Sequence, residues 1–411
     1  MSNLSKIESY ARLAVEKGVG FKKGQKLLIR SDVNAAYFAR MLAKVAWELG
    51  AEDVFIRYMD EKEQRLRFLN GGDDIFGIRK KYLDEFMKQM VDDDYQLIAV
   101  LSNDPENLKG VDTDRIAKET KMISEASKPL SDRASAGDIQ WSLAAIPSPS
   151  WAMKVFPNEP SEEAAIEKMW DAIFVATRVS EGDPVKNWDE HVKTLATQAK
   201  KLQSYNFDSL TFKNSYGTNL EIGLPKGHFW ASCGEEAKTG NIFIANIPTE
   251  EVFTAPHRDR ADGIVYATKP LVYMGNVIDK FWVKFEKGKV VDYKAEIGHD
   301  ILEKMITIHE DADRLGEVAL VPHSSPISTS GILWYNTLYD ENASCHIALG
   351  RGYAFTLPET QGLSEEEAAK LGLNQSLSHN DFMIGSACLS IMGKTTDGLE
   401  VEVFKDGEWS I

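Results

Sequence analysis

The chain has 411 residues, of which 43% are hydrophobic and 27% are charged, as is usual for a soluble globular protein with room for two domains. Its 47 basic and 63 acidic side chains give a net charge of −16. Nucleic acids and anionic membranes attract clustered positive charge, so this balance argues against both as main partners.

The first half of the chain alternates predicted helices with predicted strands. Short apolar runs predict strands at 26–30, 53–58, 96–101 and 139–146. Helical spacing of apolar residues predicts helices at 35–48, 114–134, 161–172 and 188–202. Strand, helix and strand in succession favour a parallel sheet, and the proline-rich stretch 147–151 is expected to be a loop.

The second half changes to strand after strand, with helices expected only at 301–308 and 364–371. Strands are predicted at 241–247 and 263–268, and residues 281–285 are expected to pair with 290–295 in a hairpin. The sequence therefore predicts an α+β protein of two domains. These are an α/β domain with a parallel sheet over residues 1–205 and a β-rich domain over residues 206–411.

The three cysteines, Cys233, Cys345 and Cys388, are too few and too scattered for a disulfide framework. Cys345 is expected to be a small buried residue and not a nucleophile. No apolar run approaches the roughly 18–20 residues that span a bilayer, and the N-terminus has no signal-peptide pattern. A cytoplasmic location is expected.

Five side chains that can bind metals lie within 65 residues in the last third of the chain. They stand in apolar or glycine-punctuated stretches, where an unpartnered charge would be costly to bury. The five are Glu317, Glu341, His346, His379 and Asp381. Several carboxylates with two imidazoles suit a pair of divalent cations, so this pattern indicates a hydrolase with two metals.

Local spacing suggests how these side chains meet. His379 and Asp381 would share one face of a strand, and Glu317 would share a face with apolar neighbours. His346 stands at the start of an apolar run and is a stronger candidate for a metal ligand than Glu341. Glu341, five residues earlier, reaches the same metal only if the chain turns between them, and is otherwise an acid that orients a ligand.

Two adjacent acids and a tyrosine complete the candidates. Glu250 and Glu251 follow the strand expected at 241–247, and such neighbours can divide metal binding and proton transfer between them. This reasoning favours Glu251 as the general base. Tyr353 directly follows Gly350-Arg351-Gly352, whose glycines let the backbone approach a ligand closely, and its hydroxyl could stabilise an oxyanion.

Taken together, these segments resemble the aminopeptidase T, aminopeptidase S and PepS family of dinuclear metallo-aminopeptidases. The resemblance covers the whole chain and rests on five ordered motifs. These are 246–256 (NIPTEEVFTAP), 315–319 (LGEVA), 340–343 (DENA) with His346, Gly352-Tyr353, and 379–385 (HNDFMIG).

This resemblance implies a β-rich C-terminal catalytic domain, a homodimer, and removal of N-terminal residues from peptides. By position it implies that the metal ligands are Glu250, Glu317, His346, His379 and Asp381, with Glu341 a further ligand or close acid. It implies Glu317 and Tyr353 as the catalytic pair, so the base stays open between Glu251 and Glu317. The two metals could be zinc, cobalt or manganese.

Two other classes also use such a residue set. A dinuclear phosphoesterase would clamp phosphoryl oxygens between two metals, but no cluster of lysine or arginine accompanies the candidate ligands. A non-enzymatic metal-binding protein would need neither the Glu250–Glu251 pair nor Tyr353. Peptide hydrolysis therefore remains the favoured expectation.

Overall fold

The computed structural model describes residues 3–274 and 276–411. The chain separates into two compact units, one made of 1–190 with 234–248 and the other of 191–233 with 249–411. The division falls inside helix α8 (Pro184–Tyr205), whereas the sequence predicts a boundary directly after that helix. The position of the boundary between independently folding domains stays a prediction.

The first unit is built on a parallel five-stranded sheet with the order β10-β4-β3-β1-β2. All four pairings in it are parallel, as the alternation of strands and helices predicts. Its strands are β1 (Lys26–Asp32), β2 (Asp53–Met59), β3 (Tyr95–Leu101), β4 (Trp141–Ala145) and the short β10 (Asn246–Ile247). Two further short strands, β8 (Glu235–Glu236) and β9 (Ile242–Phe243), pair with each other.

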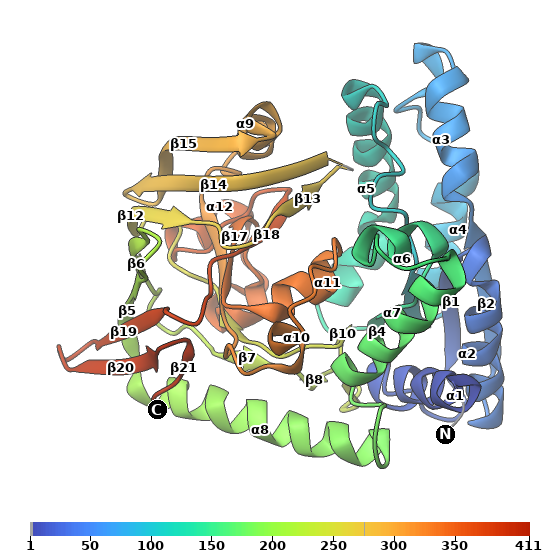
Figure 1. Cartoon of the computed structure of the whole chain (residues 1–411), viewed down its shortest axis with the longest axis horizontal. Coiled ribbons are helices and arrows are strands. Elements are labelled where there is room, and N and C mark those ends of the chain that lie inside the picture. Colours follow the sequence, from blue (N-terminus) through green and yellow to red (C-terminus); the bar gives the residue numbers. More distant parts are fainter. Residues whose placement is uncertain (1–2, 275) are drawn as a thin grey trace. The chain divides into compact units, whose positions relative to one another are not determined.

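Apart from α1, which precedes β1, the helices of this unit follow its strands along the chain (Figure 1). They are α1 (Asn3–Leu13), α2 (Ala36–Glu48), α3 (Glu61–Asn70), α4 (Lys81–Asp92), α5 (Thr113–Ser135), α6 (Pro149–Val155) and α7 (Glu162–Ala176). The side chain of Asp60 caps α3 by accepting hydrogen bonds from the amides of Lys62 and Glu63.

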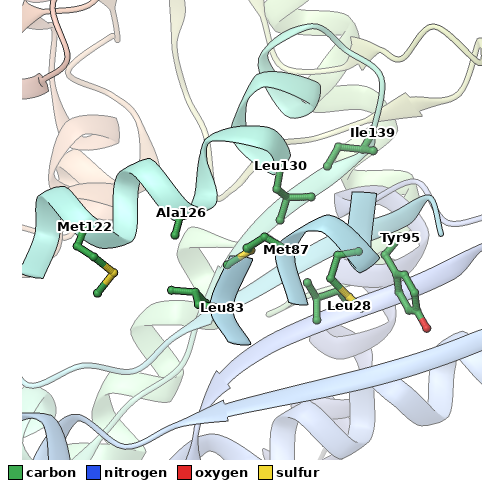
Figure 2. Packing of buried hydrophobic residues seen from close by; sticks show 9 residues of the cluster. Leu28, Leu83, Met87, Tyr95, Met122, Ala126, Leu130 and Ile139 are labelled. Atoms are coloured by element: carbon green, nitrogen blue, oxygen red, sulfur yellow. The ribbon is translucent and has the colours of Figure 1, made fainter. Parts of the chain in front are cut away.

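One core cluster of this unit joins α4 and α5 to the sheet. Leu83 and Met87 of α4 are 5% and 2% exposed, and they pack with Ala126 and Leu130 of α5 and with Leu28 of β1. Figure 2 shows the side chains of α4 lying between the other two elements. Apolar residues at helical spacing thus bury one face of each helix.

Part of the first unit differs from the sequence-based expectation. The stretch 147–151 was expected to be a loop, yet α6 begins inside it. Pro149 stands in the first turn of α6, where its missing amide costs nothing, and the Ser148 hydroxyl accepts a hydrogen bond from the amide of Trp151. The strand expected at 241–247 is instead the two short strands β9 and β10.

The second unit holds two antiparallel sheets. The larger has the order β13-β14-β12-β6-β5-β19-β20-β21, with β15 added beside β14. Its strands are β5 (Phe207–Lys213), β6 (Asn219–Gly223), β12 (Ala261–Tyr266), β13 (Leu271–Tyr273), β14 (Asn276–Glu286), β15 (Lys289–Ile297), β19 (Ser390–Thr395), β20 (Glu400–Lys405) and β21 (Glu408–Trp409). The hairpin of β14 and β15 confirms the pairing expected for 281–285 and 290–295.

The smaller sheet carries Glu317, His346, His379 and Asp381 and has the order β18-β17-β16-β11-β7. Its strands are β7 (Ala231–Ser232), β11 (Val252–Thr254), β16 (Leu315–Leu320), β17 (His346–Gly350) and β18 (His379–Met383). Among the described residues of this unit, the helices are the part of α8 from His191 onward, α9 (His299–Thr307), α10 (Pro326–Thr329), α11 (Thr337–Asp340) and α12 (Glu365–Lys370). Among the described residues, no helix is both long enough and apolar enough to cross a membrane.

Candidate metal centre

The register of the smaller sheet brings its polar side chains to one face. Glu317 is opposite Ala348, which is opposite Asp381, so the three residues share a face. His346 lies two residues before Ala348 and His379 two residues before Asp381, so both imidazoles lie on the same face. Residues on three neighbouring strands thereby converge.

A bulge in β16 sets the position of Glu317. Leu315 pairs with Leu349 whereas Glu317 pairs with Ala348, so Gly316 is the extra residue in the ladder. A Cβ on Gly316 would lie 2.2 Å from the carbonyl oxygen of Gly350 and 2.3 Å from that of Arg351. Only glycine permits this close approach of two backbones.

Glu317 lies between the two imidazoles. Its Oε1 is 3.4 Å from Nε2 of His346, and its Oε2 is 3.7 Å from Nε2 of His379. Nε2 of His379 is also 3.2 Å from Oδ1 of Asp381. One carboxylate therefore offers one oxygen to each imidazole, so Glu317 would be able to help hold a cation beside either histidine.

The adjacent acids Glu250 and Glu251 face different partners. Oε2 of Glu251 is 3.0 Å from Nε2 of His346. Oε2 of Glu250 is 3.8 Å from Nε2 of His191, on α8. In an extended segment Glu251 shares a face with Phe253, which is opposite Ala319 on the ligand-bearing face, so Glu250 points the other way.

Two groups of possible ligand atoms result, each with members within 4.8 Å of one another. They are Glu251 with Glu317 and His346, and Glu317 with His379 and Asp381. Glu317 belongs to both groups. Glu250 and Glu341, which the resemblance also implies, are in neither.

Glu341 nevertheless lies close to the centre. Burial raises the pKa of its carboxyl group, and the charges of Asp381 and Glu251 raise it further. It occupies the short 3₁₀ helix Glu341–Ala343, so the chain does turn between Glu341 and His346. The buried Asn342 donates to Oε1 of Glu341 over 3.3 Å and accepts the amide of Glu250 over 2.8 Å.

Both imidazoles present Nε2 to the carboxylates. Nδ1 of His346 is 3.1 Å from the carbonyl oxygen of Ser344, and Nδ1 of His379 is 2.7 Å from that of Arg351. A carbonyl only accepts, so each Nδ1 carries a proton and donates it. In the neutral ring Nε2 is then the free lone pair, as a metal ligand requires.

The protonation of the centre shows how strongly it attracts positive charge. Burial raises the pKa of Glu317 to about 7, with Asp381 and Glu251 adding to the effect. Although burial opposes its charged form, His379 has a pKa raised to about 10 because Asp381 and Glu317 face it. Glu317 and His379 thus bind protons more strongly than the isolated side chains would.

The donor set fits two divalent cations. Glu251, Glu317, Glu341 and Asp381 are each at most 9% exposed, and together they carry the negative charge that two such cations neutralise. Oε2 of Glu251 and Oδ1 of Asp381 are buried without a hydrogen bond of good geometry, although an imidazole nitrogen is near each. A cation would satisfy both oxygens.

Tyr353 stands beside the centre. Its ring centroid is 5.1 Å from that of His379 and 6.2 Å from that of Phe253, and its side chain is 37% exposed. Burial of the hydroxyl and then the charge of Glu317 raise the pKa of Tyr353 well above its ordinary value. The hydroxyl therefore keeps its proton and can donate a hydrogen bond.

Cys345 has no part in such chemistry. It is 1% exposed, and its thiol donates to the carbonyl oxygen of Val321 over 3.3 Å. Burial raises the pKa of Cys345 to about 12, so the thiol is neutral at physiological pH.

Comparison with known proteins identifies the family. The family described as thermophilic metalloprotease (M29) matches residues 3–409. The chain belongs to this family of metalloproteases. It is 41% identical over 405 residues to aminopeptidase AmpS of Bacillus subtilis (strain 168), covering 98% of each chain. With aminopeptidase T of Thermus aquaticus the identity is 37% over 409 residues, covering 100% of this chain and 98% of the relative.

A solved structure supports the same assignment. Wild-type AmpT from Thermus thermophilus superimposes with a TM-score of 0.92 at 34% sequence identity, covering 99% of this chain and 100% of that one. The predicted α+β fold and the predicted family are both confirmed.

Proposed function

We infer that this M29 protein is a metal-dependent aminopeptidase that removes N-terminal residues from peptides. Full-length relatives at 37–41% identity bear aminopeptidase names. The observation that carries the assignment is Glu317, whose two oxygens face two different imidazoles inside a buried acidic cluster. A pair of divalent metals held there would activate water for attack and polarise the scissile carbonyl.

We assign the metal ligands from the two groups of converging side chains. They are Glu251, Glu317, His346, His379 and Asp381. Glu251 here takes the position that the resemblance gives to Glu250, because Glu251 is the one that lies beside His346. Zinc, cobalt and manganese all suit a site of mixed imidazole and carboxylate ligands.

We assign proton transfer to a carboxylate and oxyanion stabilisation to a tyrosine. Glu317, which faces both imidazoles, accepts a proton from the attacking water and returns it to the departing amine. The Tyr353 hydroxyl donates to the carbonyl oxygen as negative charge develops on it, which is worth about 3 kcal/mol of the barrier.

Recognition of a free α-amine would make the enzyme an exopeptidase. We assign this role to Glu341, a buried acid beside both ligand groups but a member of neither. The ammonium group of the substrate would compensate its charge. A homodimer, which the family resemblance implies, and a cytoplasmic setting, which the few scattered cysteines favour, remain part of the proposal.

A phosphoesterase is less well supported. In the described part of the chain, the charged partners of Glu251, Glu317 and Asp381 within 4 Å are imidazoles, with no lysine or arginine among them. Phosphoryl transfer calls for such cations beside the metals.

The central test compares Glu317→Gln with Glu400→Gln, an exposed acid on β20. We expect the first variant to lose several orders of magnitude in kcat for leucyl-, arginyl- or aspartyl-anilides, and the second to keep its activity. Circular dichroism checks that both fold. Near-normal anilide hydrolysis by Glu317→Gln, or faster turnover of phenyl phosphate than of every anilide by the unaltered protein, would overturn the assignment.

A further inference from the structure

A hollow in the second unit is lined by none of the five assigned metal ligands. It encloses about 790 Å³, and Phe281 of β14 forms part of its wall. Phe281 packs against Phe382 with ring centroids 5.3 Å apart. Phe382 alternates with Asp381 along β18, so its side chain points to the opposite face of the sheet from the ligands. The part of the hollow at Phe281 therefore lies on the side of β18 opposite to the ligands.

The charge of this hollow is opposite to that of the protein. Three lysines line it, Lys269, Lys280 and Lys294, against a single acid, Glu296. The whole chain carries −16. Glu296 is already engaged, since its Oε2 accepts a hydrogen bond from Nζ of Lys280 over 2.9 Å. Two lysines remain to give the hollow a local positive charge.

Lys269 is the most informative of these lysines. It is half-buried, and among the described residues no carboxylate lies within 4 Å of its Nζ. Burial lowers the pKa of Lys269, and the nearby buried Asp340 offsets that effect only in part. A partly desolvated ammonium without a close anion is costly, and an anionic ligand would remove that cost.

Aromatic side chains form another part of the wall. Tyr266 on β12 is opposite Trp282 on β14, with ring centroids 6.4 Å apart, and both line the hollow from the face of β14 opposite to Phe281. Few polar groups beside an apolar wall are typical of small-molecule sites. We propose that this hollow binds a small organic oxyanion with a planar apolar body, its charged end at Lys269 and its body against Trp282 and Tyr266.

Calorimetric titration of the purified, metal-loaded protein tests this site with four probes. They are benzoate, phenyl phosphate, neutral benzamide and cationic benzylamine. We expect at least one of the two anions to bind, more weakly as salt is added, and both benzamide and benzylamine to bind at least about tenfold more weakly. Comparison of benzoate with phenyl phosphate tells which oxyanion is preferred.

Two variants locate the bound anion. Lys269→Met keeps the length of the side chain and should lower affinity about tenfold or more, as expected for loss of a charge-assisted contact. Lys226→Met, at an exposed position, is the matched control and should leave affinity unchanged. Glu317→Gln should also leave it unchanged, because the anion would not touch the metals.

Three results would overturn the proposal. One is the absence of anion binding up to about 10 mM. Another is equal binding of benzamide, which would mean an apolar hollow without charge selection. The third is binding that survives Lys269→Met but disappears in Glu317→Gln, because the anion would then occupy the metal centre. None of these results bears on peptidase activity, so failure here leaves the proposed function standing.

Discussion

Oε2 of Glu251 lies 3.0 Å from Nε2 of His346, the shortest carboxylate–imidazole distance in the centre. Its sequence neighbour Glu250 lies instead beside His191. This difference predicts that Glu251→Gln loses bound metal and most of its activity, whereas Glu250→Gln keeps its full metal content. Elemental analysis of the two dialysed variants measures the contrast, and equal loss from both would remove Glu251 from its assigned role.

Tyr353→Phe tests the oxyanion role with little disturbance to the fold, because the side chain is 37% exposed. Loss of one donor to the developing charge should lower kcat about 10²–10³-fold while KM changes little. Steady-state kinetics on one anilide gives both constants. A large rise in KM at constant kcat would instead mean that Tyr353 only helps to bind the substrate.

Removal of metal should weaken the fold as well as activity. The four acids of the centre are buried together, and without cations they repel one another or take up protons. Metal at a thousandfold excess over its dissociation constant should stabilise the protein by about 4 kcal/mol. Thermal melts before and after chelation, then after metal is restored, measure the shift. An unchanged Tm would contradict the proposed burial of charge.

His228 should make stability depend on pH. It is 3% exposed, and burial lowers its pKa, although Nδ1 donates to the carbonyl oxygen of Pro225 over 2.9 Å. Above the ordinary pKa the ring is neutral in both states. As the pH falls below about 6.5, the unfolded chain takes up a proton that the folded ring resists, so stability is lost.

Urea unfolding of the unaltered protein and of His228→Gln, at pH 8 and pH 5.5, isolates this contribution. The glutamine cannot titrate, so the variant should lose less stability than the unaltered protein between the two pH values. Equal losses would mean that His228 protonates as easily when folded as when unfolded.

The sequence predicts the fold well where periodicity is regular. Alternating apolar runs and amphipathic helices predict the parallel sheet from β1 to β4, because each pattern has a distinct period. Helices α3 and α4 have no counterpart among the predicted elements, although Asp60 is a helix-capping residue at the start of α3. The acids around it make the segment look like a polar connection.

The sequence predicts the site less well where a residue's role depends on which face of a strand its side chain occupies. The chemistry of Glu317, His346, His379 and Asp381 is visible in the sequence because charged residues interrupt apolar runs. Whether Glu250 or Glu251 faces the centre depends on β11, which has only three residues. So short a strand has too little alternation to reveal which face each acid takes.

The extra residue in β16, Gly316, makes the position of the Glu317 carboxylate depend on a β-bulge. Perfect alternation would send Leu315 to the side of Glu317 and put an aliphatic group among the ligands. Removal of the β-bulge would make the hydrogen-bond ladder regular, but it would disturb the placement of Glu317 among the ligands. Engineering for greater rigidity should therefore leave the Leu315–Glu317 segment untouched, and homologues that hydrolyse peptides should keep a residue without a side chain at its midpoint.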